Sequence, residues 1–326
     1  MAPLAGDADW RPTASRDALR LRADMLARTR AFFARRGVLE VETPLLSATT
    51  VTDLHLHSVP ARLEGLGRTL WLQTSPEHAM KRLLAAGSGP IYQLARAFRD
   101  GEVGRRHNPE FTLLEWYRPG FDDHRLMDEV TALLAELLPA RLRRLAEERW
   151  SYRALLHDRL GVDPLTGSNA QLRAAAGSGL PAGDLDRDDL LAFLLTHHVE
   201  PTLPADRLVF LHDFPPSQAA LARLARDARG ELVARRFEVY AGGVELANGF
   251  WELADADQQR RRFEHDLARR RERGLPEVAV DELLLAAIAA GLPDCAGVAL
   301  GFDRLVMLAA GADRLDAVLA FPVDRA

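Results

Sequence analysis

Arginine, aromatic and glycine residues stand at the ends of strand patterns in three short segments of this sequence. The first segment, residues 37–44, is a strand pattern that closes with proline. In the second, Arg99 ends one strand pattern and Phe111 begins the next. The third, residues 297–304, is a Gly-rich strand that leads to Arg304 at the start of a helix. Guanidinium groups pair with phosphate oxygens and an aromatic ring can stack on a base, so the second and third segments predict a site for ATP.

The sequence contains a single lysine, Lys81, although 42 of its residues are Lys or Arg. A Walker P-loop requires Gly-Lys-Ser/Thr, and a protein kinase requires a strand lysine with a paired catalytic loop. Neither pattern surrounds Lys81. If the protein binds ATP, arginines must therefore hold its phosphates.

Two carboxylates, Glu245 and Glu252, stand in an otherwise apolar segment. Burying them is costly unless they meet a cation. Positions seven apart on a regular strand face opposite sides. We therefore predict a bend at Asn248-Gly249 that brings both acids to one site.

The composition limits the class and the compartment of the protein. The chain has 326 residues, of which 48% are hydrophobic, and this is enough for one large domain or two ordinary ones. Its net charge is −5, whereas proteins that bind nucleic acid non-specifically usually carry an excess of positive charge. The single cysteine, Cys295, excludes an internal disulfide and fits a reducing compartment. Because no long apolar stretch and no export-type N-terminus is present, we expect a cytoplasmic protein without membrane contact.

Periodic patterns predict the elements that must position these residues. Strand patterns occur at residues 38–41, 69–73, 91–99, 111–117, 237–240, 244–247 and 297–301. Helical patterns occur at residues 16–36, 77–87, 255–273 and 281–290. The arginine runs in the helix at 255–273 are interpreted as a solvated face. Residues 123–230 are mainly helical, and we expect them to be an insertion into a single catalytic domain that spans residues 1–326.

In their order, the three segments resemble the signature motifs of class II aminoacyl-tRNA synthetases. Ser75-Pro76-Glu77, the run 106–118 and the acidic segment narrow this resemblance to the lysyl-tRNA synthetases. It covers nearly the whole chain and implies an α/β (α+β) fold, in which a class II synthetase-like antiparallel sheet is flanked by helices. Those synthetases carry an anticodon-binding domain before the catalytic core, whereas here only residues 1–15 precede the first predicted helix.

A lysine-activating core without an anticodon-binding domain resembles the ligases that attach (R)-β-lysine to a lysine of elongation factor P. This resemblance implies that ATP and Mg²⁺ serve to form an aminoacyl-adenylate, and that elongation factor P accepts the amino acid. It also implies a homodimer, and no tRNA partner is expected. Two alternatives are a lysine-activating synthetase paralog that charges tRNA or a small acceptor, and a non-catalytic subunit that senses an amino acid.

The same resemblance implies the residues of the site, with Arg99 and Arg304 in catalysis. The expected substrate-binding residues are Ser75, Pro76, Glu77, Tyr117, Asn248, Glu252 and Ala299. The expected ATP-binding residues are Arg99, Asp100, Gly101, Glu102, Asn108, Phe111, Glu245, Leu246, Gly301 and Arg304, and Glu245 and Glu252 are expected to approach Mg²⁺.

Two positions depart from the pattern of the lysyl-tRNA synthetases. Ala299 stands where those enzymes usually have glycine, which implies a pocket floor reshaped for a β-amino acid. The second motif usually reads Arg-x-Glu, but here Glu102 lies one residue further from Arg99. The partner of this displaced carboxylate is open at this stage.

Overall fold

The computed structural model of the chain describes residues 10–140, 142, 145–181, 183 and 185–326. Residues 1–9, on which part of the expectation about export rests, lie outside the described residues. Within these described ranges, no helix is long and apolar enough to span a membrane.

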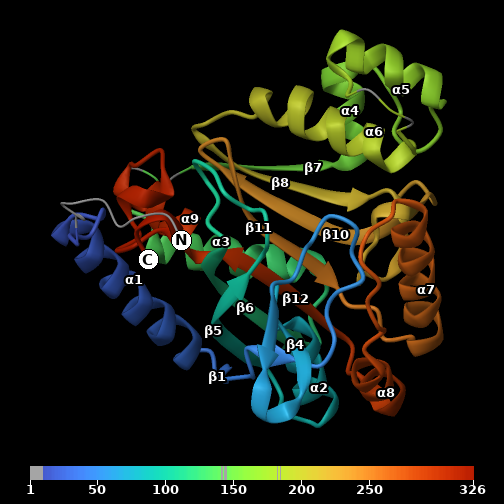
Figure 1. Ribbon diagram of the computed structural model, residues 1–326. Coiled ribbons are helices and arrows are strands. Elements are labelled where there is room, and N and C mark those ends of the chain that lie inside the picture. The colour runs from blue at the N-terminus through green and yellow to red at the C-terminus, as the bar shows by residue number, and fades with distance from the viewer. Residues whose placement is uncertain (1–9, 141, 143–144, 182, 184) are drawn as a thin grey trace.

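A sheet of nine strands forms the centre of the described part of the molecule (Figure 1). The strands run in the order β1-β5-β6-β12-β11-β10-β8-β7, and the short β9 pairs with β10. The pairs β1/β5 and β7/β8 at the two edges are parallel, and the pairs between them are antiparallel. The bounds are β1 (Leu39–Glu40), β5 (Ile91–Phe98), β6 (Glu110–Pro119), β7 (Ala146–Ser151), β8 (Arg207–Phe214), β9 (Leu224–Arg226), β10 (Leu232–Ala241), β11 (Val244–Trp251) and β12 (Cys295–Gly301).

A small second sheet and a set of helices surround the large sheet, so the predicted mixed fold with a mainly antiparallel sheet is confirmed. The small sheet consists of β2 (Leu46–Ser47), β4 (Arg68–Leu72) and β3 (Pro60–Leu63). The helices are α1 (Arg16–Ala34), α2 (Glu77–Ala85), α3 (Asp123–Leu137), α4 (Tyr152–Leu160), α5 (Asn169–Ala176), α6 (Arg187–Leu194), α7 (Ala256–Glu272), α8 (Glu282–Gly291) and α9 (Phe302–Ala310).

The main hydrophobic core lies between one face of the sheet and the helices α1, α3 and α9. Phe33 of α1, Trp116 of β6 and Leu300 of β12 are fully buried there. Because side chains alternate along a strand, the strand neighbours of Trp116 and Leu300 point to the opposite face of the sheet. On that face β6 presents Glu115 and β12 presents Ala299, and there the site is built.

The predicted insertion at 123–230 contributes to two cores. Helix α3 packs in the main core, whereas α4, α5 and α6 form a separate apolar cluster with β8. Figure 1 shows these three helices as a lobe at one end of the sheet. Strands β7, β8 and β9 also fall in this range and extend the sheet. The division into one domain and an insertion stays a prediction.

The predicted bend at Asn248-Gly249 is wrong, because β11 continues through both residues. The register shifts earlier: Val239 of β10 pairs with Ala247, whereas the next residue pairs with Glu245. One extra residue in β11 therefore reverses the alternation, as a β-bulge does.

Gly249 is required for close packing and does not form a turn. A Cβ at this position would lie 2.4 Å from the ring of Phe237. The bulge brings Glu245 and Asn248 to the same open face, while the two residues between them are buried in the core.

Candidate active site

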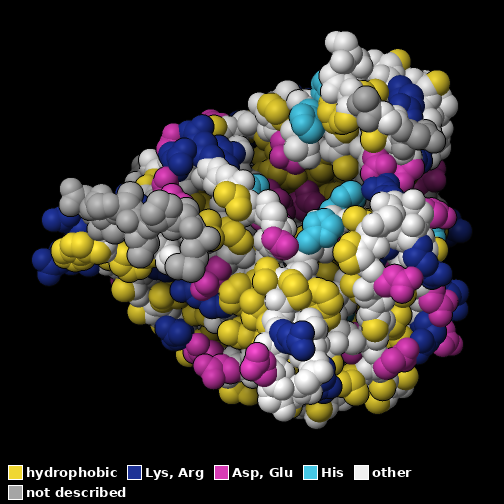
Figure 2. Space-filling model, viewed as in Figure 1, with side chains coloured by type: hydrophobic (Ala, Val, Ile, Leu, Met, Phe, Trp, Pro, Cys, Tyr) yellow, Lys and Arg dark blue, Asp and Glu magenta, His cyan; other side chains and the backbone are white. Residues whose placement is uncertain are grey.

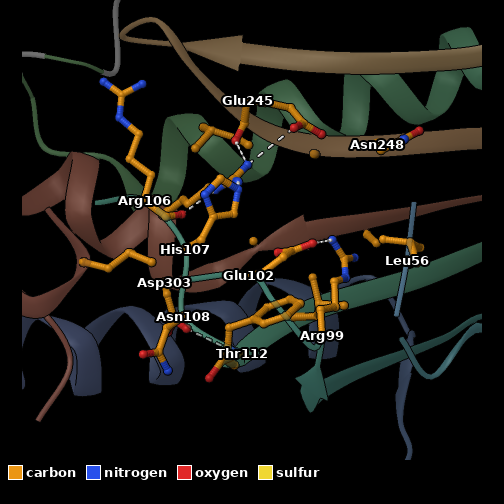
Figure 3. A pocket seen from close by; sticks show the side chains of 18 of the residues that line it. Leu56, Arg99, Glu102, Arg106, His107, Asn108, Thr112, Glu245, Asn248 and Asp303 are labelled. Atoms are coloured by element: carbon orange, nitrogen blue, oxygen red, sulfur yellow. Dashed lines mark hydrogen bonds and ion pairs between the residues drawn. The ribbon is translucent and has the colours of Figure 1, made fainter. Parts of the chain in front are cut away.

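A cavity of about 370 Å³, here called the first cavity, opens between β6, β11, β12 and α9 (Figure 3). It brings together the second and third sequence segments. The predicted ATP-binding residues in its lining are Arg99, Glu102, Asn108, Phe111, Glu245, Leu246, Gly301 and Arg304.

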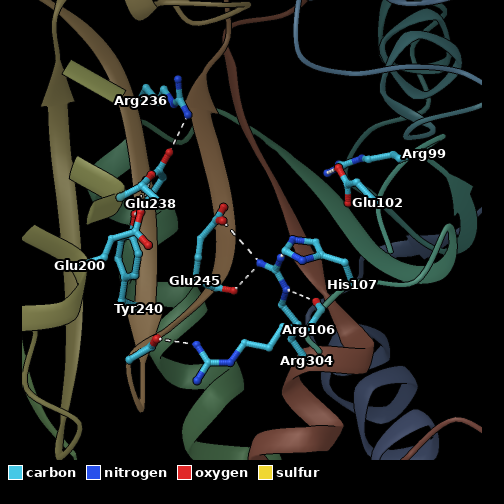
Figure 4. A network of polar contacts seen from close by, with 12 residues as sticks. Arg99, Glu102, Arg106, His107, Glu200, Arg236, Glu238, Tyr240, Glu245 and Arg304 are labelled. Atoms are coloured by element: carbon cyan, nitrogen blue, oxygen red, sulfur yellow. Dashed lines mark hydrogen bonds and ion pairs between the residues drawn. The ribbon is translucent and has the colours of Figure 1, made fainter. Parts of the chain in front are cut away.

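Arg304 lies between the loop before β6 and the start of β11. Its Nη1 donates to the carbonyl oxygen of Glu245 at 2.9 Å and lies 3.4 Å from the Glu245 carboxylate. Its Nη2 donates to Nε2 of His107 at 2.7 Å, and its Nε donates to the carbonyl oxygen of Arg106 (Figure 4). The guanidinium is thereby fixed at the cavity wall. Burial and the charge of Arg304 lower the pKa of His107, which leaves its Nε2 free to accept.

Arg99 has unused hydrogen-bonding capacity in the first cavity. Its guanidinium carbon lies 5.0 Å above the ring of Phe111, and Nη1 is 3.5 Å from the carboxylate of Glu102. Its Nε is buried and has no hydrogen-bond partner among the described residues. Because an unpartnered buried N–H is costly, this group favours an incoming oxygen acceptor such as a phosphate.

The structure does not bring Asp100 and Gly101 to the first cavity. Asp100 is exposed, and neither residue belongs to the lining. Gly101 has a φ of 80°, a left-handed conformation that turns the chain after Arg99. This turn carries Glu102 back to Arg99, so the displaced carboxylate replaces Asp100 at the cavity.

Asp303 is a residue that the sequence reasoning missed, although it directly precedes Arg304. It is 2% exposed. Its Oδ2 accepts a hydrogen bond from the backbone N–H of Thr112 at 2.9 Å, and Oδ1 lies 2.6 Å from Nη2 of Arg22 on α1. It therefore holds β6, next to Phe111, against α1 and α9.

A second cavity of about 330 Å³ adjoins the first and shares Arg99, Asn248 and Ala299 with it. Of the predicted substrate-binding residues, Ser75, Glu77, Asn248 and Ala299 line this second cavity. Pro76, Tyr117 and Glu252 are outside its lining. Figure 2 shows a hollow in the surface between the lobe of α4–α6 and the rest of the molecule. Acidic and histidine side chains lie near this hollow.

Behind the second cavity, the lone lysine joins two of the predicted acids. Lys81 Nζ lies 2.7 Å from Oε1 of Glu77 and 2.6 Å from Oε2 of Glu252. Lys81 and Glu252 are each 1% exposed. Sequence reasoning gave Lys81 no role in the site, because its partner Glu252 is 171 positions away in the chain.

Glu115 is a further missed residue of the second cavity. One carboxylate oxygen accepts a hydrogen bond from the Tyr117 hydroxyl at 2.7 Å, and the other, Oε2, is buried without a partner in the part of the chain that the structure describes. A signal was available, because two residues separated by one position share a face of a strand. Glu115 thus offers the cavity an acceptor that lacks a donor.

The acidic groups around Lys81 outnumber the cation. Burial raises the pKa of Glu115 to about 8, with a further contribution from Glu77. Burial likewise raises the pKa of Glu252 to about 7, although Lys81 acts in the opposite direction. Three carboxyl groups face one ammonium here, so a cationic ligand would be stabilised.

Gly297 of β12 provides the space for this arrangement. A Cβ there would lie 2.3 Å from the ring of Tyr117 and 2.6 Å from Oε1 of Glu252. The glycine of the third segment is therefore required by close packing of the acidic cluster.

The expected pairing of Glu245 and Glu252 on Mg²⁺ does not fit the structure. Glu245 lines the first cavity and faces Arg304, whereas Glu252 is buried against Lys81. In the described ranges, no group of three or more His, Cys, Asp or Glu side chains could hold a metal ion. Of these two residues, Glu245 is the one that can offer a carboxylate to a cation that arrives with phosphates.

A polar network stands behind the junction of the two cavities (Figure 4). Arg236 lines both cavities and its Nη2 donates to Glu238 at 2.6 Å. The hydroxyl of Tyr240 donates to the other oxygen of Glu238, also at 2.6 Å. Burial, followed by the charges of Glu238 and Glu245, raises the pKa of Glu200 to about 7. This network fixes the guanidinium of Arg236 at the junction.

The sheet, the two arginines and the paired cavities define an amino-acid-activating catalytic core. The family model of the class II tRNA synthetases (D, K and N) matches residues 7–325, and the chain belongs to this family. It is also 52% identical, over 99% of its length and 100% of theirs, to proteins named elongation factor P–(R)-β-lysine ligase from Salmonella dublin, Salmonella gallinarum and Salmonella paratyphi B.

Proposed function

We propose that the protein activates (R)-β-lysine with ATP as an aminoacyl-adenylate and transfers it to a lysine side chain of elongation factor P. The observation that carries this proposal is the junction of the two cavities at Arg99, Asn248 and Ala299. A nucleotide in the first cavity and a diamino acid in the second would meet there. The 52% identity over the full chain to ligases of this name supports the same substrates.

Activation needs no general base. The carboxylic acid of an amino acid has a pKa of about 4, so it is ionised at neutral pH and can attack the α-phosphate directly. Arg99, with its unpartnered Nε, would stabilise the negative charge at phosphorus, and Arg304 would stabilise the departing pyrophosphate. Mg²⁺ bound to the phosphates and Glu245 would supply further positive charge.

The acidic cluster would recognise the amines of the substrate. An ammonium donates three hydrogen bonds and accepts none. Glu115 offers a buried oxygen without a donor, and Glu77 lines the same cavity. Lys81 neutralises part of the cluster and holds Glu77 in place. Glu252 would act on the substrate only through Lys81, as a positioning residue.

One experiment tests the proposal directly. Purified protein is incubated with ATP, Mg²⁺, (R)-β-lysine and elongation factor P, and the intact mass of the acceptor is measured. The expected result is an acceptor heavier by one β-lysyl group, with AMP and pyrophosphate released. Charging of tRNA in place of the protein acceptor would favour the synthetase alternative. Absence of pyrophosphate exchange with any amino acid would favour the sensing subunit.

The proposal includes a homodimer in the cytoplasm. Leu39 of the edge strand β1 and Leu45, both in or next to the first sequence segment, are 56% and 40% exposed. Exposed apolar side chains beside an unpaired strand edge favour a protein interface. The single cysteine supports a reducing compartment.

A further inference from the structure

Helix α7 forms one wall of the second cavity. Gln259, Phe263, Asp266 and Arg269 all line it. Their spacings of four, three and three residues place them on one face of the helix over three turns. The wall therefore carries an amide, a ring, a carboxylate and a guanidinium in sequence.

Burial along this wall decreases toward the C-terminal end of α7. Gln259 is 1% exposed and Phe263 is 3% exposed, whereas Asp266 and Arg269 are half-buried. Ala192 of α6, which also lines the cavity, is exposed. The wall thus runs from an open rim, where α6 and α7 meet, to a closed inner end.

The arginine at the rim, Arg269, already forms an ion pair. Arg269 forms an ion pair with Asp186, and Arg273 contacts both Asp186 and Asp189 at the start of α6. These pairs join α7 to the lobe of α4–α6. The guanidinium of Arg269 is thus directed to Asp186, although its charge still acts to lower the pKa of Asp266.

Asp266 is a half-buried carboxylate with no direct ion-pair partner among the described residues, although the charges of His265, Arg269 and Arg262 act on it from a greater distance. Its Oδ2 accepts a hydrogen bond from Thr52 Oγ1 at 2.9 Å, and among the described residues it forms no ion pair. Burial raises the pKa of this group to about 6, and the charge of Asp53 adds to the effect. At neutral pH Asp266 is therefore still mainly ionised and can bind a cation.

The inner end of the wall has a second acceptor without a donor. The side-chain oxygen Oε1 of Gln259 is buried, and no described residue forms a hydrogen bond with it. A buried amide oxygen in this state favours a ligand that donates. Between Gln259 and Asp266, Phe263 and Leu221 offer apolar surface. An amine on a flexible apolar stem matches this order of groups.

We infer that the wall of α7 admits the acceptor lysine and that Asp266 binds its ammonium group. This inference rests on the proposed function, because it assigns the entry of the protein acceptor to the rim between α6 and α7. Asp266 binds the ammonium group first, at the rim; as this group moves inward toward the junction of the two cavities, the apolar stem of the lysine follows it past Phe263. Asp266 thereby acts in transfer and has no part in activation.

The test separates the two half-reactions in the variant Asp266→Asn. Pyrophosphate exchange with (R)-β-lysine needs no acceptor, and we expect its kcat/KM to stay within about twofold of the wild type. Transfer to elongation factor P is expected to lose about tenfold or more, through a higher KM for the acceptor. Thr52→Val, which removes the hydrogen bond that orients Asp266, is expected to raise the same KM by a smaller factor.

Glu264→Gln is the matched control, because it removes the same charge from an exposed position two residues away on α7. We expect it to behave as the wild type. An unchanged acceptor KM in Asp266→Asn, with a wild type that transfers normally, would overturn the inference. A parallel loss of exchange would also overturn it, since Asp266 would then bind the substrate amine. Failure of the proposed function itself would be distinct, because the wild type would modify no acceptor.

Discussion

Ala299 on β12 lies directly beside Glu115 on β6, in register across the antiparallel pair. On its other side, Ala299 is in register with Asn248 of β11. Side chains at such positions have Cβ atoms about 4.5–5.5 Å apart. The methyl group of Ala299 therefore forms the floor between a buried carboxylate and the junction with the first cavity.

Replacing Ala299 by Gly is expected to raise activity with α-lysine relative to (R)-β-lysine. The added space lies beside the carboxylate end of the substrate, where the two amino acids differ by the position of an amino group. A single methyl changes discrimination by about 1–3 kcal/mol, or roughly 10- to 200-fold. The ratio of kcat/KM for the two amino acids measures the effect. An unchanged ratio in a folded variant would falsify this view of the floor.

Arg99→Ala and Arg304→Ala are each expected to abolish pyrophosphate exchange while the protein stays folded. Each change removes a cation from the first cavity, and transition-state charge there would be unbalanced. Arg105→Ala is the control, because Arg105 is an exposed arginine of the same loop that binds Asp313 outside the cavity. Normal exchange in either cavity variant would contradict its role.

Lys81→Met is expected to lower the free energy of unfolding by about 3–5 kcal/mol, because buried carboxylates lose their cation. The loss should shrink at lower pH, where Glu252, whose pKa burial raises to about 7, takes up a proton. The neighbouring variant Arg82→Met, at an exposed position of the same helix, should stay within about 0.5 kcal/mol of the wild type. Urea denaturation at two pH values compares the two variants. Equal stabilities would show that Lys81 is dispensable.

Glu115→Gln is expected to flatten the dependence of stability on pH. Burial raises the pKa of Glu115 to about 8, above the ordinary 4.5, so the folded state holds a proton that the unfolded chain releases between these values. This contribution to the free energy of unfolding is complete below pH 4.5 and is lost as the pH rises through 8. Its slope is at most about 1.4 kcal/mol per pH unit.

The same variant tests recognition of the substrate. An incoming ammonium group would favour the ionised form of Glu115, and the neutral amide cannot supply this charge, so the KM for (R)-β-lysine should rise about tenfold. Denaturation curves from about pH 5 to 9 and exchange kinetics provide the two measurements. If both profiles match the wild type, Glu115 neither titrates as described nor contacts the amine.

Sedimentation equilibrium at micromolar concentration is expected to give twice the 36.1 kDa mass of the chain. Leu39→Asp places a charge on the exposed edge strand β1 and should shift the protein toward the monomer. A wild type that sediments as a monomer would exclude the dimer.

Local patterns were enough to predict the elements that carry Arg99 and Arg304. Strand alternation and the glycine before a helix are encoded in neighbouring residues, so the hairpin of β5 and β6 and the start of α9 could be predicted. The bulge in β11 could not, because a register shift is defined only against β10. The pattern alone placed Glu252 seven positions after Glu245 and therefore suggested a bend at Asn248-Gly249.

Contacts between residues that are distant in the chain could not be predicted from the sequence either. The arginine runs of α7 were interpreted as a solvated face, yet Arg269 pairs with Asp186 and Arg262 donates to backbone carbonyls of residues 220 and 222. The partners of an arginine are chosen by tertiary structure. For the same reason, Lys81 showed no role until α2 was placed against the strand end that carries Glu252.

The burial of Lys81 also bears on self-modification. An aminoacyl-adenylate is an electrophile that acylates accessible amines, and an enzyme that produces it is the first protein within its reach. This chain has one side-chain amine, which is 1% exposed and held between two carboxylates. This side-chain amine is thus shielded from the adenylate, and lysine-directed cross-linkers in a complex with the acceptor would attach to lysines of the acceptor.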